Sequence, residues 1–61
     1  MDNTKIIIEA IEKEENGLSI TELVENTSLS RGQIRTTLAF LLGAKQIIER
    51  PAGMAKLYFI K

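Results

Sequence analysis

The stretch Ser30–Ala44, S-R-G-Q-I-R-T-T-L-A-F-L-L-G-A, governs how the rest of the chain is interpreted. It opens with a capping box, because Gln33 follows the N-cap candidate Ser30 by three positions and each side chain can bond the other's backbone N–H. Behind this cap, the residues of one stripe recur at helical spacing. They are Ile34, Thr37, Leu38, Leu41 and Leu42. The pattern predicts a helix over about residues 31–44 that buries one side.

The same predicted helix carries polar side chains near its N-terminal end. Gln33 and Thr36 project away from the apolar stripe. Arg31 and Arg35 lie at the margin of the stripe, and their long stems can carry the guanidinium groups outward. An apolar back with Arg, Gln and Thr near the N-terminus is typical of a helix that reads the DNA major groove. An ordinary amphipathic helix shows the same pattern, so the neighbouring segments must decide.

A first helix is predicted from residues 2–4, D-N-T, any of which suits an N-cap, to about Glu15 or Asn16. Gly17 then ends it, since glycine takes the left-handed conformation without a steric penalty. Three consecutive isoleucines wrap too far round a helix for all of them to face one small core. Ile6 is therefore either a single exposed apolar residue or part of a homodimer contact made through Ile6, Ile7 and Ile8.

A second helix, from Ile20 to Asn26, is predicted by another capping box, S-x-x-E, which starts at Ser19. Residues 18–20 form a short extended link at its start. Residues 27–29, T-S-L, then lead directly to the cap of the next helix. Two short helices joined by so few residues make a helix-turn-helix pattern.

After the third predicted helix, β-branched and aromatic residues become frequent. Two such segments, Gln46–Arg50 and Lys56–Ile60, flank the sequence P-A-G-M. Pro51 cannot continue a hydrogen-bonded ladder and Gly53 supplies a turn. Residues 46–60 are therefore predicted to form a β-hairpin.

The composition excludes several classes of function. With 61 residues the chain has room for one domain, residues 1–61, and a small core. It contains no histidine or cysteine, no glycine-rich phosphate loop and no G-x-S-x-G motif. We therefore expect neither an enzyme nor a protein that needs a metal, a cofactor or a small-molecule ligand. No apolar run approaches the roughly 18 residues of a membrane span and no secretory signal is visible, so a cytoplasmic protein is expected.

The net charge of zero hides an asymmetry along the chain. Residues 1–29 hold seven acidic and two basic side chains, a formal charge of −5. Residues 30–61 hold one acidic and six basic side chains, a formal charge of +5. Such a split indicates a half that binds a polyanion. The basic half begins on the candidate reading helix, which favours nucleic acid as that polyanion.

The order of helix, short strand, helix, turn, helix and hairpin resembles the winged helix-turn-helix superfamily over the whole chain. The segments that carry the resemblance are L-S-I-T-E-L-V from Leu18, S-L-S-R-G-Q-I-R-T-T-L from Ser28 and I-I-E-R from Ile47. The resemblance implies an α+β fold, mostly α, with three helices, a short strand after the first helix and a C-terminal hairpin as the wing. It also implies double-stranded DNA as the partner, with the third helix in the major groove and the wing on the backbone.

Two departures from the superfamily pattern concern the exit of the third helix and the wing. Many members have a glycine just before the second strand, where this chain has Lys45 and Gln46. The tip of the wing, residues 51–54, has no basic residue. This argues against an arginine inserted into the minor groove.

The residues expected to read base edges, at the start of the third helix, are Arg31, Gln33, Arg35 and Thr36. Those expected to contact phosphates, around the helix ends and on the hairpin, are Ser28, Ser30, Lys45, Arg50 and Lys56. The other interpretation of Arg31 and Arg35 is that they form salt bridges with Glu22 or Glu25. Phe40 is expected to pack under the wing or against a partner chain.

We expect a sequence-specific DNA-binding protein that serves as a small transcriptional regulator. The alternative is a winged helix that docks onto another protein without binding DNA, since fold does not dictate function. The zero net charge, the uncharged wing tip and the apolar surplus on the first helix favour docking. The basic half and the Arg, Gln and Thr residues favour DNA.

Overall fold

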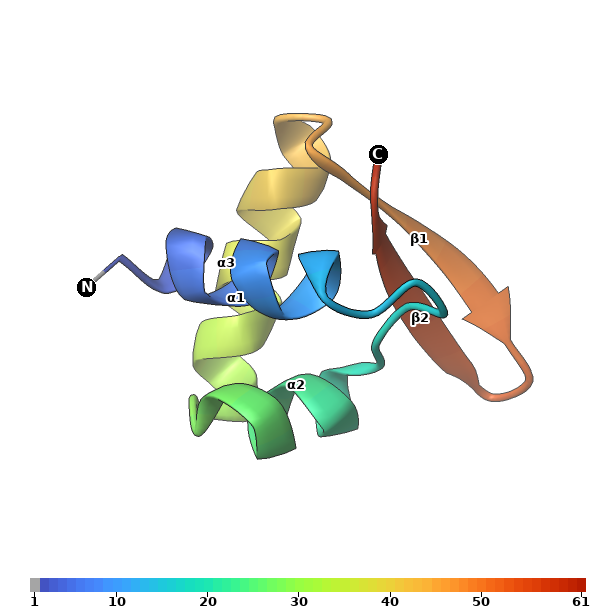
Figure 1. Ribbon diagram of the computed structural model, residues 1–61, viewed down its shortest axis with the longest axis horizontal. Coiled ribbons are helices and arrows are strands. Elements are labelled where there is room, and N and C mark those ends of the chain that lie inside the picture. The colour runs from blue at the N-terminus through green and yellow to red at the C-terminus, as the bar shows by residue number, and fades with distance from the viewer. Residues whose placement is uncertain (1) are drawn as a thin grey trace.

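Residues 2–61, which the computed structural model describes, form three helices followed by a two-stranded antiparallel hairpin (Figure 1). The elements in chain order are α1 (Asn3–Glu12), α2 (Ile20–Thr27), α3 (Arg31–Gly43), β1 (Ile47–Ala52) and β2 (Ala55–Ile60). Helix α1 crosses in front of α3, α2 lies at the N-terminal end of α3, and the hairpin stands at one side. The fold is a small α+β arrangement that is mostly helical.

Helix α1 is shorter than the sequence indicates. Its N-cap is Asp2, whose side chain accepts from a backbone N–H of the first turn at 2.9 Å. The helix ends at Glu12, so the prediction of an end at Glu15 or Asn16 is wrong. Ile11 is the last buried residue of the helix, and the four charged residues that follow it are exposed. A longer helix would therefore bury no further apolar surface.

Gly17 closes the loop after α1 in the left-handed conformation that the sequence predicts, with φ +80°. It is also buried against the ring of Phe59, and a Cβ at this position would lie 2.7 Å from Phe59 Cζ. Both the backbone conformation and the close approach of β2 therefore require glycine.

Both predicted capping boxes form. At the start of α2, the Glu22 N–H donates to Ser19 Oγ at 3.2 Å and the Ser19 N–H donates to Glu22 Oε1 at 3.0 Å. At the start of α3, the Gln33 N–H donates to Ser30 Oγ at 3.1 Å and the Ser30 N–H donates to Gln33 Oε1 at 3.0 Å. Each box satisfies backbone donors that the start of a helix leaves without partners.

The turn between α2 and α3 is fixed by its own side chains. Thr27 Oγ1 donates to the Leu23 carbonyl at 2.6 Å and accepts from the Leu29 N–H at 3.2 Å. Ser28 ends α2 in the left-handed conformation, with φ 63°. Leu29 packs against the core and the chain enters α3 directly at the Ser30 cap. The relative placement of the two helices thus follows from local bonds.

Helix α3 ends in a Schellman motif. The Lys45 N–H donates to the Leu42 carbonyl and the Gln46 N–H donates to the Leu41 carbonyl, both at 3.0 Å. Lys45 has φ 60°, in the left-handed region that glycine adopts most easily. Lys45 therefore occupies a backbone conformation that suits glycine, close to the position where many winged helix-turn-helix proteins have a glycine.

The hairpin turns on Gly53 and Met54, between the paired residues Ala52 and Ala55. Gly53 has φ 63°, the sign that the first central residue of a type II′ turn requires. A two-residue turn of this kind matches the twist of its strands and fixes their register.

Pro51 lies inside β1, opposite Lys56, so the prediction that it cannot continue the ladder is wrong. The short strand expected after α1 is a single bridge, in which Leu18 exchanges two backbone hydrogen bonds with Tyr58, at 2.9 and 3.1 Å. The backbone groups of Tyr58 therefore point away from β1, and those of Lys56, two residues along, do the same. Pro51 is thus not required to donate to β2, and its nitrogen faces the free edge of β1.

One apolar core joins the helices and the hairpin. Its buried residues are Ile7, Ile11, Leu18, Leu23, Ile34, Leu38, Leu41, Ile47 and Tyr58. The predicted stripe of the third helix is confirmed by the burial of Ile34, Thr37, Leu38 and Leu41, and its fifth member, Leu42, is half-buried against the core. Thr37 is a buried polar residue, and its Oγ1 donates to the Gln33 carbonyl at 2.8 Å. The side of α3 away from this stripe is free for other contacts.

Candidate functional site

The N-terminal half of α3 presents polar side chains to solvent, namely Arg31, Gln33, Arg35 and Thr36. One turn after Arg35 and Thr36, the exposed residues are Ala39 and Phe40. With 63% of its surface exposed, Phe40 does not pack under the hairpin, so the first of its two expected positions is wrong, while contact with a partner chain stays a prediction. The free side of α3 is therefore polar in its first half and apolar in its second half.

Gln33 is partly occupied by its capping role. Its Oε1 accepts from the Ser30 N–H at 3.0 Å, so this acceptor is used within the protein. The Nε2 group keeps its two donors. Gln33 can therefore donate to a base edge, but a bidentate pair with adenine would require the cap to open.

Arg31 is directed toward α2. Its Nη2 donates to Thr21 Oγ1 at 3.0 Å. Arg31 also lines a groove of about 320 Å³ between the starts of α2 and α3 and the hairpin. Lys56 and Tyr58 line the same groove from β2. The structure thus brings Arg31, expected to read bases, together with Lys56, expected to contact a phosphate.

One ion pair occurs among residues 2–61, between Lys56 Nζ and Glu49 Oε1 at 3.6 Å. Both partners keep solvent access, with 62% of the Lys56 side chain and 37% of the Glu49 side chain exposed. The alternative in which Arg31 and Arg35 form salt bridges with the glutamates of α2 is therefore wrong.

Tyr58 links the hairpin to the charged side chains around the groove. Burial raises the pKa of Tyr58, and the nearby carboxylate of Glu49 raises this pKa further. The positive charge of Arg35 lowers the pKa of the same phenol. Arg35 of α3 and Glu49 of β1 therefore both act on the hydroxyl of Tyr58, which anchors β2 in the core.

The two basic residues of the hairpin lie on opposite faces of it. Arg50 and Lys56 belong to neighbouring cross-strand pairs, and the side chains of neighbouring pairs point to opposite sides of a sheet. Lys56 shares the face of Tyr58. The Arg50 guanidinium carbon lies 5.7 Å from the centre of the Phe59 ring, on the face that meets Gly17. Arg50 and Lys56 are therefore not brought together.

The remaining candidates for phosphate contacts lie at the two ends of α3. Ser28 and Ser30 are exposed at its start, close to Arg31 in the chain. Lys45 is exposed beyond its other end, about 20 Å away along the helix axis. The start of α3 therefore gathers most of the predicted site, and Lys45 stands apart.

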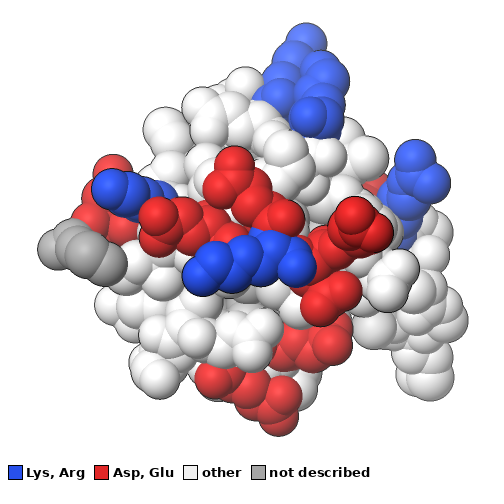
Figure 2. All heavy atoms as spheres, viewed as in Figure 1, with Lys and Arg blue, Asp and Glu red and all other residues white. Residues whose placement is uncertain are grey.

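The charge asymmetry of the sequence becomes an asymmetry of the surface. Figure 2 shows the side that α1 covers, where acidic side chains gather over the centre and the lower part. The exposed acidic residues of α1, α2 and the segments beside them are Asp2, Glu9, Glu12, Glu14, Glu15, Glu22 and Glu25. Arg31 and Arg35 project from α3, which runs behind α1 in this view. Acidic side chains thus lie mainly on α1, α2 and the segments beside them, which also carry Lys5 and Lys13, whereas α3, the hairpin and their flanks carry the other basic residues and Glu49.

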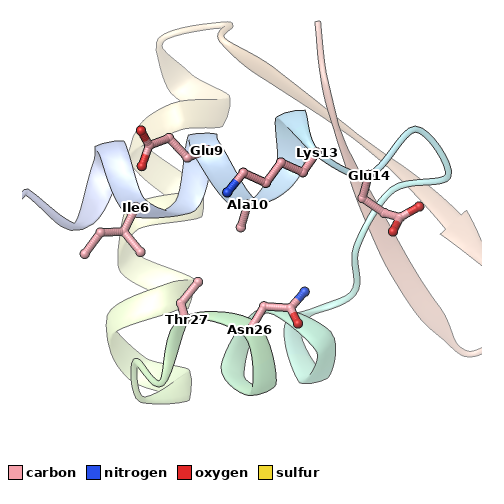
Figure 3. Close-up of a pocket in the computed structure, with 7 residues that line it drawn as sticks. All are labelled: Ile6, Glu9, Ala10, Lys13, Glu14, Asn26 and Thr27. Carbon is pink, nitrogen blue, oxygen red and sulfur yellow. The ribbon is translucent and has the colours of Figure 1, made fainter.

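A second groove, of about 460 Å³, lies between α1 and α2 (Figure 3). Ile6 and Ala10 point from α1 toward α2 in it, and none of the residues expected to bind DNA lines it. Ile7 is 0% exposed, so the expectation that it contacts a second copy of the chain is wrong. Ile6 and Ile8 are half-buried and remain accessible to a partner.

Three residues around the groove between α3 and the hairpin carry no recognisable sequence motif, namely Thr21, Glu49 and Tyr58. Glu49 and Tyr58 could have been placed beside Lys56 from the sequence if the two-residue turn at Gly53 had been recognised. That turn sets the strand register, and the register decides which strand residues share a face. Thr21 has no such signal, since its bond to Arg31 spans the turn between two helices.

Within the described part of the chain, no group of three or more side chains suited to metal binding lies together. No helix of residues 2–61 has the length and apolar character needed to cross a membrane. No family model, curated protein or solved structure matches the chain.

Proposed function

We propose that the chain binds double-stranded DNA as a winged helix-turn-helix domain, with α3 in the major groove and the β1–β2 hairpin as a wing on the backbone. The observation that carries this proposal is the groove where Arg31 of α3 meets Lys56 of the hairpin, beside the exposed Arg35 and Thr36. Cations from two elements border one groove, while most acidic residues lie on α1, on α2 and in the segments beside them. This placement suits a polyanion whose bases are also within reach.

The geometry supports different roles for the residues at the start of α3. Arg35 and Thr36 are assigned to base edges, because both are exposed on the free side of the helix. Gln33 is assigned a donor role only, since its oxygen closes the cap. Arg31 is better suited to a phosphate, because its guanidinium lies in the groove with Lys56. With such base contacts the protein would act as a sequence-specific transcriptional regulator.

A fluorescence anisotropy titration with a labelled mixed-sequence duplex at two salt concentrations tests this function. We expect weak binding whose salt dependence corresponds to roughly two to four phosphate contacts. Arg31→Gln should weaken binding, whereas Lys13→Gln, which removes a cation on the acidic side, should leave it unchanged. Absence of binding at the lowest salt and the highest protein concentration would contradict the proposal.

A second candidate function, docking onto another protein, is favoured by the apolar second half of α3. Ala39 and Phe40 are exposed there, and Met54 is fully exposed at the tip of the hairpin. A protein surface would cover such residues more effectively than a DNA backbone would. If the duplex titration fails, this function replaces DNA binding.

A homodimer remains part of the proposal, through the half-buried Ile6 and Ile8 of α1. A two-fold dimer would present two copies of α3 to half-sites about one helical turn of DNA apart. Sedimentation equilibrium tests it: Ile6→Ser should shift a dimer toward monomer. A monomeric wild-type protein at high concentration would exclude this assembly.

A further inference from the structure

Glu49 is the single acidic residue of residues 30–61, and it lies among the cations of the proposed DNA surface. Its Oε1 is 3.6 Å from Lys56 Nζ. Glu49 is also the cross-strand partner of Tyr58, and the charges of Glu49 and of Arg35 both act on the Tyr58 hydroxyl. A negative charge therefore stands beside the groove to which the proposed function brings phosphates.

We propose that Glu49 is an internal substitute for a DNA phosphate, which pairs with Lys56 in the free protein and is replaced by the DNA backbone in the complex. This inference rests on the proposed function and identifies a residue that regulates it. Because binding exchanges one ion pair for another, Lys56 adds less to the affinity than an unpaired lysine would. Since phosphates carry no sequence information, this loss of affinity is the same for every duplex. Discrimination between sequences is then left to the base contacts of α3.

The geometry of the pair suits such an exchange. Both side chains keep solvent access, so Lys56 can leave without stranding a buried charge. The separation of 3.6 Å exceeds the 2.7–2.9 Å that is typical of a tight charge-assisted hydrogen bond. Glu49 is paired across the strands with Tyr58, which is 5% exposed, so the strand register keeps Glu49 on the face of the groove whether or not Lys56 is present. Lys56 is thus the more exposed partner of the pair, and it is the one that can turn to a phosphate.

A double-mutant cycle with Glu49→Gln and Lys56→Gln tests the exchange, with a labelled mixed-sequence duplex at one low salt concentration. We expect Glu49→Gln to tighten binding about two- to fivefold, the range that exposed ion pairs span. Lys56→Gln should weaken binding by a larger factor in the Glu49→Gln protein than in the wild type. Glu12→Gln, an equal change of charge at an exposed site on α1, should leave the affinity unchanged.

Each outcome of the cycle decides between the alternatives. Equal factors for Lys56→Gln with and without Glu49, or weaker binding by Glu49→Gln, overturn the inference and leave the proposed function intact. Absence of binding by all four proteins overturns both. Thermal melts accompany the titrations, because residue 49 is the cross-strand partner of the buried Tyr58. If Glu49→Gln melts at a lower temperature, Glu49→Thr, which suits a strand, takes its place in the cycle.

Discussion

The side of the molecule formed by α1 and α2 and the side formed by α3 and the hairpin share one core but differ at their surfaces. Each side contributes fully buried residues to that core, such as Leu23 from α2 and Leu41 from α3. At the surface, seven acidic residues belong to the first side and six basic residues to the second. The buried residues of the two sides thus pack into one core, while the exposed residues give each side a different charge. Changes in the shared core should therefore affect stability, and changes at the surface of one side should affect binding.

The largest effect is expected from Leu41→Ala, which should destabilise the fold by about 2–5 kcal/mol because it opens a cavity in the shared core. Leu42→Ala, at the half-buried neighbouring position, should cost less. Chemical denaturation should give coincident transitions for the helical circular dichroism and for the fluorescence of Tyr58, the single tyrosine. Separate transitions would show that the two sides are independent folding units.

The second-largest loss of stability is expected at a contact between the two sides, where Gly17 meets the ring of Phe59. Gly17→Ala should destabilise the protein by about 2–3 kcal/mol, because it combines a left-handed backbone with overlap of the Phe59 ring. Gly53→Ala is the matched control, since it has a similar φ but no atom within 4 Å of the added methyl group. It should cost about 1 kcal/mol. Equal losses of unfolding free energy would mean that the ring moves aside freely.

The divided surface is tested by Arg35→Ala and Lys56→Ala, each measured on a selected preferred duplex and on a scrambled one. Arg35→Ala should cost about 1–3 kcal/mol on the preferred duplex and relax discrimination at one position. Lys56→Ala should weaken both duplexes alike, by a smaller amount because Glu49 already occupies this lysine. Arg50→Ala, on the other face of the hairpin, should change binding least. A change of sequence preference in the hairpin variants alone would refute the assignment of α3 as the reading element.

The smallest effect is a dependence of stability on alkaline pH through Tyr58. Because its pKa is raised in the folded state, mainly by burial, the folded protein holds the phenolic proton more tightly than the unfolded chain. This contribution is fully present below about pH 10 and is lost as the pH rises through the higher folded pKa. Melting temperatures measured across this range should therefore fall more steeply for the wild type than for Tyr58→Phe. Parallel curves would exclude the effect.

Features that depend on neighbouring residues are predictable from this sequence. The capping boxes at Ser19 and Ser30 and the left-handed Gly17 follow from rules that act within a few residues. The end of α1 is not predictable in the same way. Gly17 marks the end of the loop, whereas the helix ends at Glu12, one residue after its last buried residue, Ile11.

Features that depend on register or on contacts across a turn are not predictable from local patterns. Pro51 fits inside β1 only because the backbone N–H and C=O groups of its partner, Lys56, point away from β1. The direction of these groups depends on the register that the turn at Gly53 sets. The same register separates Arg50 from Lys56 and places Glu49 beside the lysine. A count of basic residues on the hairpin therefore overestimates the cations that can act together.

The position of Pro51 has a further consequence, for behaviour at high concentration. An exposed sheet edge is a template on which strands of other molecules can add, and such growth leads toward amyloid-like aggregates. Strand β1 leaves one edge open, but Pro51 places a nitrogen without a hydrogen on that edge. The charged residues Glu49 and Arg50 beside it also oppose the addition of another strand. The hairpin can therefore project from the helices without seeding the growth of fibrils.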